Sequence, residues 1–108
     1  MKKLIYVLAI LACVACNSAQ SRLEAQMQAQ AEMVLSRSAD AFTGVSFDDE
    51  DAFSLAFAEM VASLDEAYDS FDSDDDRQQF SEYLSNALDE SDIDEDVAVI
   101  ISANIRAY

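Results

Sequence analysis

The only two cysteines of this 108-residue chain, Cys13 and Cys16, lie three positions apart. A Cys-x-x-Cys pair can form a redox disulfide or supply two thiolates to a zinc ion. A zinc site needs four ligands, and the chain has no histidine and no third cysteine to complete one. A redox motif needs a folded scaffold around it, whereas this pair ends an apolar N-terminal run. The chemistry of the pair therefore depends on what that run is.

The N-terminal run has the layout of a secretory signal sequence. Lys2 and Lys3 give it a positive start, and residues 4–15 form 12 consecutive apolar residues that end in small side chains. A helix that spans a bilayer takes about 20 such residues, so this run is too short to be one. A buried core helix would show polar positions on one side, and this run shows none. We therefore predict that residues 1–15 are a cleaved signal peptide.

Residues 13–16, CVAC, resemble the lipobox of bacterial lipoproteins, in which small or aliphatic residues precede an invariant cysteine. In that class the cysteine is diacylated on its sulfur, and cleavage just before it makes it the first residue of the mature protein. Val14 and Ala15 match the pattern, whereas Cys13 stands where an aliphatic residue is usual. An alternative box, ILAC, would lipidate Cys13 but leaves an apolar core of only nine residues. The resemblance thus implies lipidation at Cys16, with Cys13 as the alternative.

Lipidation would anchor the chain to a membrane of the bacterial cell envelope through acyl chains such as palmitate. Residues 16–20 would be the lipidated cysteine and a short tether, which would hold the following domain close to the membrane. The residue after Cys16 is Asn17 rather than Asp. In sorting of the enteric type, which this segment resembles, that choice favours the outer membrane, facing the periplasm, in a Gram-negative bacterium.

The chain is strongly acidic. It has 22 Asp and Glu residues against six Lys and Arg, a formal net charge of −16. Only four arginines but all 22 acidic residues follow Cys16, so the mature chain has a side-chain charge of −18. This charge repels nucleic-acid phosphates and argues against nucleic acid as a partner. It favours a basic envelope protein as partner, or adaptation to a salty habitat.

Two acidic clusters, residues 72–76 and 89–96, raise the question of calcium binding. The EF-hand loop needs acidic ligands at its first, third and fifth positions, glycine at the sixth and glutamate at the twelfth. A loop that starts at Asp72 has Arg77 and Tyr83 at the last two of these positions, and a loop that starts at Asp92 has Val97 and Ala103. Neither loop meets the requirements, so we predict no metal site. The clusters are explained by the preference of acids for helix N-termini.

The sequence offers no catalytic group that stands out from its surroundings. Histidine is absent, lysine is absent after Cys16, and no glycine-rich phosphate loop is present. The serines have no neighbouring base to activate them, and carboxylates are too abundant for any pair to be singled out. We therefore predict that the protein is not an enzyme and needs no cofactor.

One glycine and no proline indicate an all-α fold. Apolar residues recur at helical spacing in four segments, from about residue 21 to 42, from about 47 to 71, after Ser73 and after Ser91. Ser46, Ser73 and Ser91 are the expected N-caps, and Gly44 is placed to end the first helix. The apolar stripes are Leu23, Met27, Ala31, Val34, Leu35 and Phe42; Phe53, Phe57, Met60, Leu64, Ala67, Tyr68 and Phe71; Phe80, Tyr83, Leu84, Ala87 and Leu88; and Ile93, Val97, Ile100, Ile101 and Ile105.

Each stripe covers one side only, so the four helices must pack together. Short connections favour antiparallel neighbours, and we predict that residues 21–108 form an acidic bundle of about four antiparallel helices. The β-branched run VAVII would also suit a strand, although no second strand exists to pair with it. Leu55 and Val99 fall outside the stripes, as isolated exposed residues or as a contact surface.

These observations favour a lipid-anchored protein of the bacterial cell envelope with a binding or structural role. Two alternatives stay open. One is an acidic inhibitor or immunity-type protein that binds a basic partner, and the other is a weak binder of divalent cations.

Overall fold

The computed structural model describes residues 18–108, so the predicted signal peptide, Cys13 and Cys16 lie outside the described residues. Four helices occupy this part of the chain: α2 (Ser18–Phe42), α3 (Glu50–Asp69), α4 (Asp74–Glu90) and α5 (Glu95–Asn104). It contains no strand, and the run VAVII lies within α5. The described residues thus form the predicted small all-α bundle.

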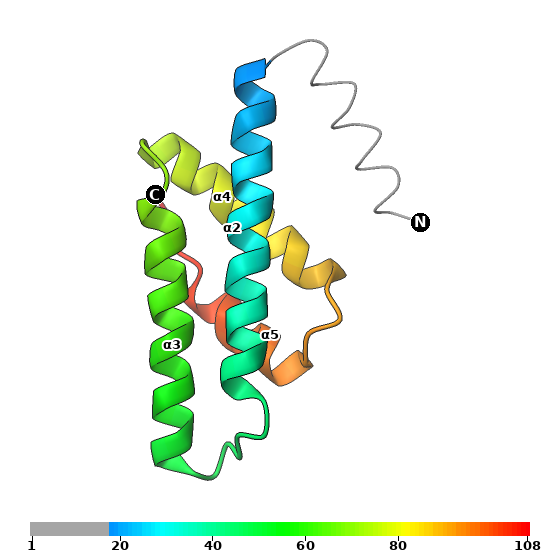
Figure 1. The fold of residues 1–108 in the computed structure, drawn as a ribbon, viewed down its shortest axis with the longest axis vertical. Helices are drawn as coiled ribbons and strands as arrows, with labels where there is room; N and C mark the ends of the chain where they lie inside the picture. Colours follow the sequence, from blue (N-terminus) through cyan, green and yellow to red (C-terminus); the bar gives the residue numbers. More distant parts are fainter. Residues whose placement is uncertain (1–17) are drawn as a thin grey trace.

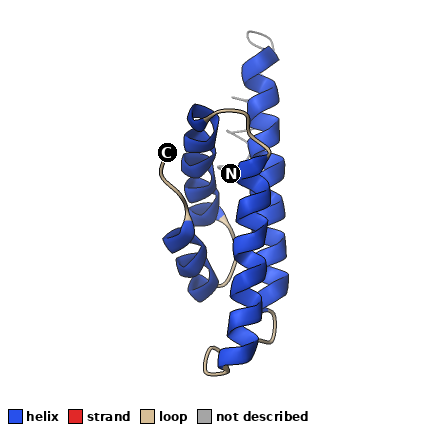
Figure 2. Ribbon diagram, turned by 90° about the vertical axis from the view of Figure 1, so that its left-hand side faces the viewer, coloured by secondary structure: helices blue, strands red, loops and turns tan. Residues whose placement is uncertain are grey.

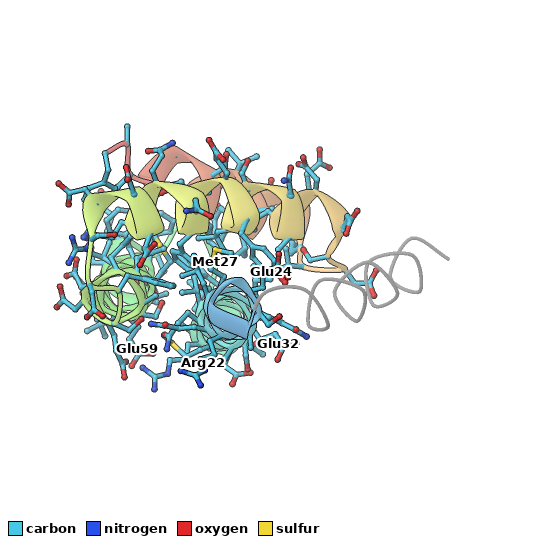
Figure 3. All side chains as sticks on the ribbon, turned by 90° about the horizontal axis from the view of Figure 1, so that it is seen from above. Arg22, Glu24, Met27, Glu32 and Glu59 are labelled. Carbon is cyan, nitrogen blue, oxygen red and sulfur yellow. The ribbon has the colours of Figure 1, made fainter. Side chains whose placement is uncertain are left out.

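The helices are arranged in two layers. Helices α2 and α3 lie side by side and run in opposite directions, and α4 and α5 form a second layer packed against them (Figures 1 and 2). Helix α4 does not follow the bundle axis but crosses α2 obliquely. Seen along the long axis, Met27 of α2 lies on the side of α4, whereas Arg22 and Glu59 lie on the opposite side (Figure 3). The α2–α3 pair is therefore covered on one side only.

The core is built from the predicted stripes. Each helix contributes buried apolar side chains, and the remaining stripe members are half-buried at the edges of the core. The buried apolar residues are Met27, Ala31, Val34, Phe42, Ala56, Met60, Leu64, Ala67, Tyr68, Phe71, Phe80, Leu84, Leu88, Val97 and Ile101. Burial of each large side chain contributes about 1.5–3 kcal/mol, and no helix alone would bury its stripe.

The end of α2 matches the expectation for the single glycine. The helix ends at Phe42, and Gly44 follows with a φ of 72°, in the left-handed region that residues with a Cβ atom rarely adopt. The start of α2 lies at Ser18, earlier than the expected residue 21. The helix therefore begins within the segment predicted to be a tether.

Of the three predicted N-caps, only Ser73 is confirmed, with its Oγ accepting a hydrogen bond from the backbone N–H of Asp76 (3.1 Å). Helix α3 is capped by Asp49 instead of Ser46, and α5 by Asp94 instead of Ser91. Ser, Asp and Asn are nearly equivalent as caps, but an aspartate also places negative charge at the positive end of the helix dipole. Each aspartate lies three residues after the expected serine, so both helices start later than predicted.

Candidate functional site

A cleft of about 670 Å³ lies at the end of the bundle where α2 ends. Its walls come from two segments far apart in the sequence, the C-terminal turn of α2 with the following loop (residues 39–47) and the start of α5 with the preceding loop (residues 92–97). The apolar lining consists of Ala39, Phe42, Val45, Phe47, Ile93 and Val97. The polar lining includes three carboxylates, those of Asp92, Asp94 and Asp96. The cleft thus has apolar walls and an acidic edge.

Phe47 is the most exposed part of the apolar lining, with 45% of its surface accessible. Its ring is held edge-on against Phe42 (centroids 6.0 Å apart) and Phe53 (5.5 Å), a favourable geometry for aromatic pairs. Phe53 continues the cluster by stacking on Phe57 (6.2 Å). Phe47 is therefore supported from one side and open on the other, although the sequence pattern placed it at the start of a helix and gave no sign of a cleft.

The fold places the two acidic clusters far apart, with Asp92, Asp94 and Asp96 of the second cluster lining the cleft. Asp48 and Asp49 follow Phe47 in the chain but do not line the cleft. The cluster at residues 72–76 joins α3 to α4 at the opposite end of the bundle (Figure 1). Within residues 18–108, no group of three acidic side chains is placed to hold a metal ion.

Three of the arginines form ion pairs with residues that do not line the cleft. Arg37 of α2 pairs with Glu66 of α3, and Arg106 pairs with Asp65. A hydrogen bond to Asp65 raises the pKa of Arg106 above its ordinary value, so this arginine stays charged.

Arg77 closes the C-terminal end of α3. Its guanidinium donates to the carbonyl oxygens of Tyr68 (3.2 Å) and Phe71 (2.8 Å) and to the carboxylate of Asp74 (2.9 Å). Among residues 21–108, three arginines thus stabilise the bundle itself, and the exposed Arg22 lies near the start of α2.

Two buried hydroxyl groups, those of Tyr68 and Ser81, are bound to the C-terminal segment. The Arg106 N–H donates to the Tyr68 hydroxyl (3.1 Å), and the Ser81 hydroxyl donates to the Arg106 carbonyl (2.6 Å). Because the Ser81 hydrogen is used in that way, the Tyr68 hydroxyl donates to Ser81 Oγ (2.6 Å). The three bonds close a ring that ties α3, α4 and the C-terminal segment together. Sequence patterns did not indicate this ring.

Tyr83 marks a second acidic surface, between α2 and α4. Burial raises its pKa above the usual 10.0, and the negative charges of Glu32, Glu24 and Glu90 raise it further. One carboxylate oxygen of Glu24 is buried with no hydrogen-bond partner among the described residues. This surface repels anions, as the cleft does.

The two residues predicted to stand outside the stripes are exposed as expected, Leu55 at 72% and Val99 at 63%. Neither lines the cleft.

The predicted lipidation site at Cys16, and its alternative Cys13, lie outside the described residues. None of the helices between residues 18 and 108 is long and apolar enough to cross a membrane. Comparison with protein-family models, curated proteins and solved structures finds no match for this chain.

Proposed function

We propose that this chain is a lipid-anchored protein of the bacterial cell envelope that binds a partner protein and catalyses no reaction. The observation that carries the anchor is the lipobox-like CVAC at residues 13–16, which follows a positively charged and apolar N-terminal run. Helix α2 begins at Ser18, so the domain would lie directly beside the lipidated Cys16. Asn17 supports the outer membrane of a Gram-negative bacterium as the location, with the domain in the periplasm.

The distribution of charge supports a binding role. The chain carries a formal net charge of −16, and three of its arginines are already paired within the bundle. The acidic surface therefore keeps a strong field, which attracts basic proteins and repels anionic ones. An acidic inhibitor or immunity-type protein that blocks a basic partner is the more specific form of this proposal. The buried Tyr68 and Ser81 hydroxyls are held in hydrogen bonds with each other and with the Arg106 backbone, so neither is offered as a nucleophile in this proposal.

The anchor is tested by metabolic labelling with a palmitate analogue in a bacterial host. Label and membrane association should both be lost in Cys16→Ala and kept in Cys13→Ala, which is the matched control. If the label is lost in Cys13→Ala alone, the lipidated residue is Cys13 and not Cys16. A protein that is never labelled would contradict the lipid anchor.

The binding role is tested by cross-linking in native membranes, followed by purification at low and at high salt. A basic partner should be recovered at about 50 mM salt and be largely lost at about 500 mM, where screening acts over only a few Å. A partner recovered equally at both salt concentrations would contradict a mainly electrostatic association.

A further inference from the structure

We infer that the cleft at the end of α2 binds a basic segment of a partner protein, with an apolar side chain of that segment against Phe47 and cationic side chains against Asp92 and Asp96. This inference rests on the proposed binding function and adds the place and the chemistry of recognition. It is carried by the shape of the cleft, the charge of its edge and its position relative to the predicted anchor.

The shape suits a short peptide segment with one or two apolar side chains. A volume of about 670 Å³ lies within the range of about 300–1,000 Å³ that is typical of ligand-binding clefts. Phe42, Ile93 and Val97 give the cleft an apolar interior, and Phe47 offers a half-exposed aromatic surface at its opening. A small hydrated cation would gain nothing from these walls, whereas a leucine or phenylalanine side chain would be desolvated by them.

The negative charge at the edge of the cleft favours a positively charged ligand. Asp92 and Asp96 are exposed, and no arginine pairs with either of them within the described residues. Asp94 accepts a hydrogen bond from the N–H of Asp96 (2.9 Å) as the helix cap, which leaves its negative charge in place. Phe47 is followed in the chain by four acidic residues, 48–51, which do not line the cleft but add negative charge beyond Phe47. An anionic ligand or a second copy of this chain, with its own charge of −16, would be repelled.

The position makes the cleft accessible to a partner. Helix α2 has 25 residues, and at 1.5 Å per residue its two ends lie about 37 Å apart. The predicted anchor at Cys16 precedes one end, and Phe42 lines the cleft at the other. A basic protein of the envelope can therefore reach the cleft without competition from the lipid surface.

The test uses the full-length chain in detergent micelles and two fluorescently labelled peptides, KRKLFKRK and KRKSSKRK. Fluorescence anisotropy should show that the first peptide binds about tenfold more tightly than the second, because burial of an apolar side chain is worth at least that factor. Phe47→Ala should weaken binding of KRKLFKRK about fivefold and leave KRKSSKRK unchanged. Leu55→Ala, which removes another exposed apolar side chain outside the cleft, should change neither affinity.

A pair of charge variants tests the edge of the cleft. Asp92→Asn combined with Asp96→Asn should weaken binding of KRKLFKRK about fivefold to tenfold, since each exposed ion pair contributes a factor of a few. The control is Asp72→Asn combined with Asp75→Asn, which changes the net charge equally at the start of α4, at the other end of the bundle. It should weaken binding less than about twofold. Circular dichroism verifies that all variants remain helical.

The possible outcomes distinguish a failure of the inference about the cleft from a failure of the proposed function. If the two charge variants weaken binding equally, the cleft is not the binding site, because the attraction then comes from the overall negative charge. The proposal of a basic partner would still stand. Failure of Phe47→Ala to weaken KRKLFKRK would overturn the apolar part of the inference. If neither peptide binds while cross-linking still recovers a basic partner, recognition lies outside the cleft. If no basic partner is recovered either, the proposed binding function fails as well.

Discussion

The ring of hydrogen bonds that joins Tyr68, Ser81 and Arg106 makes a strong prediction about stability. Ser81 is 4% exposed, and its hydroxyl both accepts from Tyr68 and donates to the Arg106 carbonyl. Ser81→Ala removes both bonds without changing the volume much, and it leaves the buried Tyr68 hydroxyl without its acceptor. An unsatisfied buried polar group costs about 1–3 kcal/mol, and the Arg106 carbonyl is only partly buried. We expect a loss of about 2–3 kcal/mol in the free energy of unfolding.

The assay is urea unfolding of the full-length chain in detergent, followed by circular dichroism. Ser85→Ala is the matched control, since Ser85 is an exposed serine of the same helix, α4. Alanine favours a helix over serine by up to about 0.5 kcal/mol at both positions, so the difference between the two variants isolates the hydrogen bonds. For a domain of this size, 2 kcal/mol corresponds to a fall of roughly 10 °C in the melting temperature.

A double-mutant cycle with Tyr68→Phe tests whether the ring acts as a unit. Once Tyr68 has lost its hydroxyl, Ser81→Ala can remove only the bond to the Arg106 carbonyl, so the second substitution should cost about 1 kcal/mol less than in the wild type. Additive losses would show that the two hydroxyls contribute independently. A loss in Ser81→Ala no larger than in Ser85→Ala would refute the structural role of the ring.

Other predictions follow from the backbone, the net charge and the raised pKa of Tyr83. Gly44→Ala should cost about 1–2 kcal/mol in unfolding free energy because the φ of 72° is strained for alanine, and an unchanged urea midpoint would contradict this backbone conformation. Raising the sodium chloride concentration from about 10 to 300 mM should raise the urea midpoint by screening the net charge of −16, whereas a fall would show that ion pairs outweigh repulsion. Tyr83 has a pKa above 10.0, so ultraviolet titration should show a late-ionising tyrosine that Tyr83→Phe removes. Its neutral form is favoured by the fold, so its contribution to stability is complete below pH 10 and is lost as the pH rises through the folded-state pKa. Calorimetry with calcium should give no saturable heat at millimolar concentration, since both candidate loops lack the glycine and the closing glutamate.

The N-caps of α3 and α5 show that the local sequence alone does not determine where a helix starts. In two places a serine precedes an aspartate by three residues, and both residue types can accept the hydrogen bond at a helix N-terminus. The residues between them form turns, in which the Ser46 hydroxyl accepts from the Asp48 N–H (3.4 Å) and the Ser91 hydroxyl accepts from the Ile93 N–H (3.4 Å). Those turns are part of the connection between packed helices, so the helix starts depend on tertiary structure.

The buried serines are a second feature that the periodicity of the sequence does not predict. Ser38, Ser63 and Ser81 are almost completely buried, although apolar periodicity treats serine as a surface residue. Ser63 satisfies its hydroxyl within its own helix by donating to the Met60 carbonyl (2.7 Å). Ser81 does so only because the C-terminal segment returns to α4. Partners 25 residues apart, such as Ser81 and Arg106, leave no periodic signal in the sequence.

The sequence by itself determined the all-α fold, the four helices and the sides that they bury, because helical periodicity is a local property of 10–25 residues. It also placed the single glycine where the backbone needs a positive φ. The tertiary structure alone decided that residues 92–96 meet the loop of Phe47 while residues 72–76 lie at the opposite end. The physical reason is that a stripe specifies which side of a helix is buried but not which neighbour covers it or at what angle. The oblique course of α4 and the return of the C-terminal segment result from packing among all four helices.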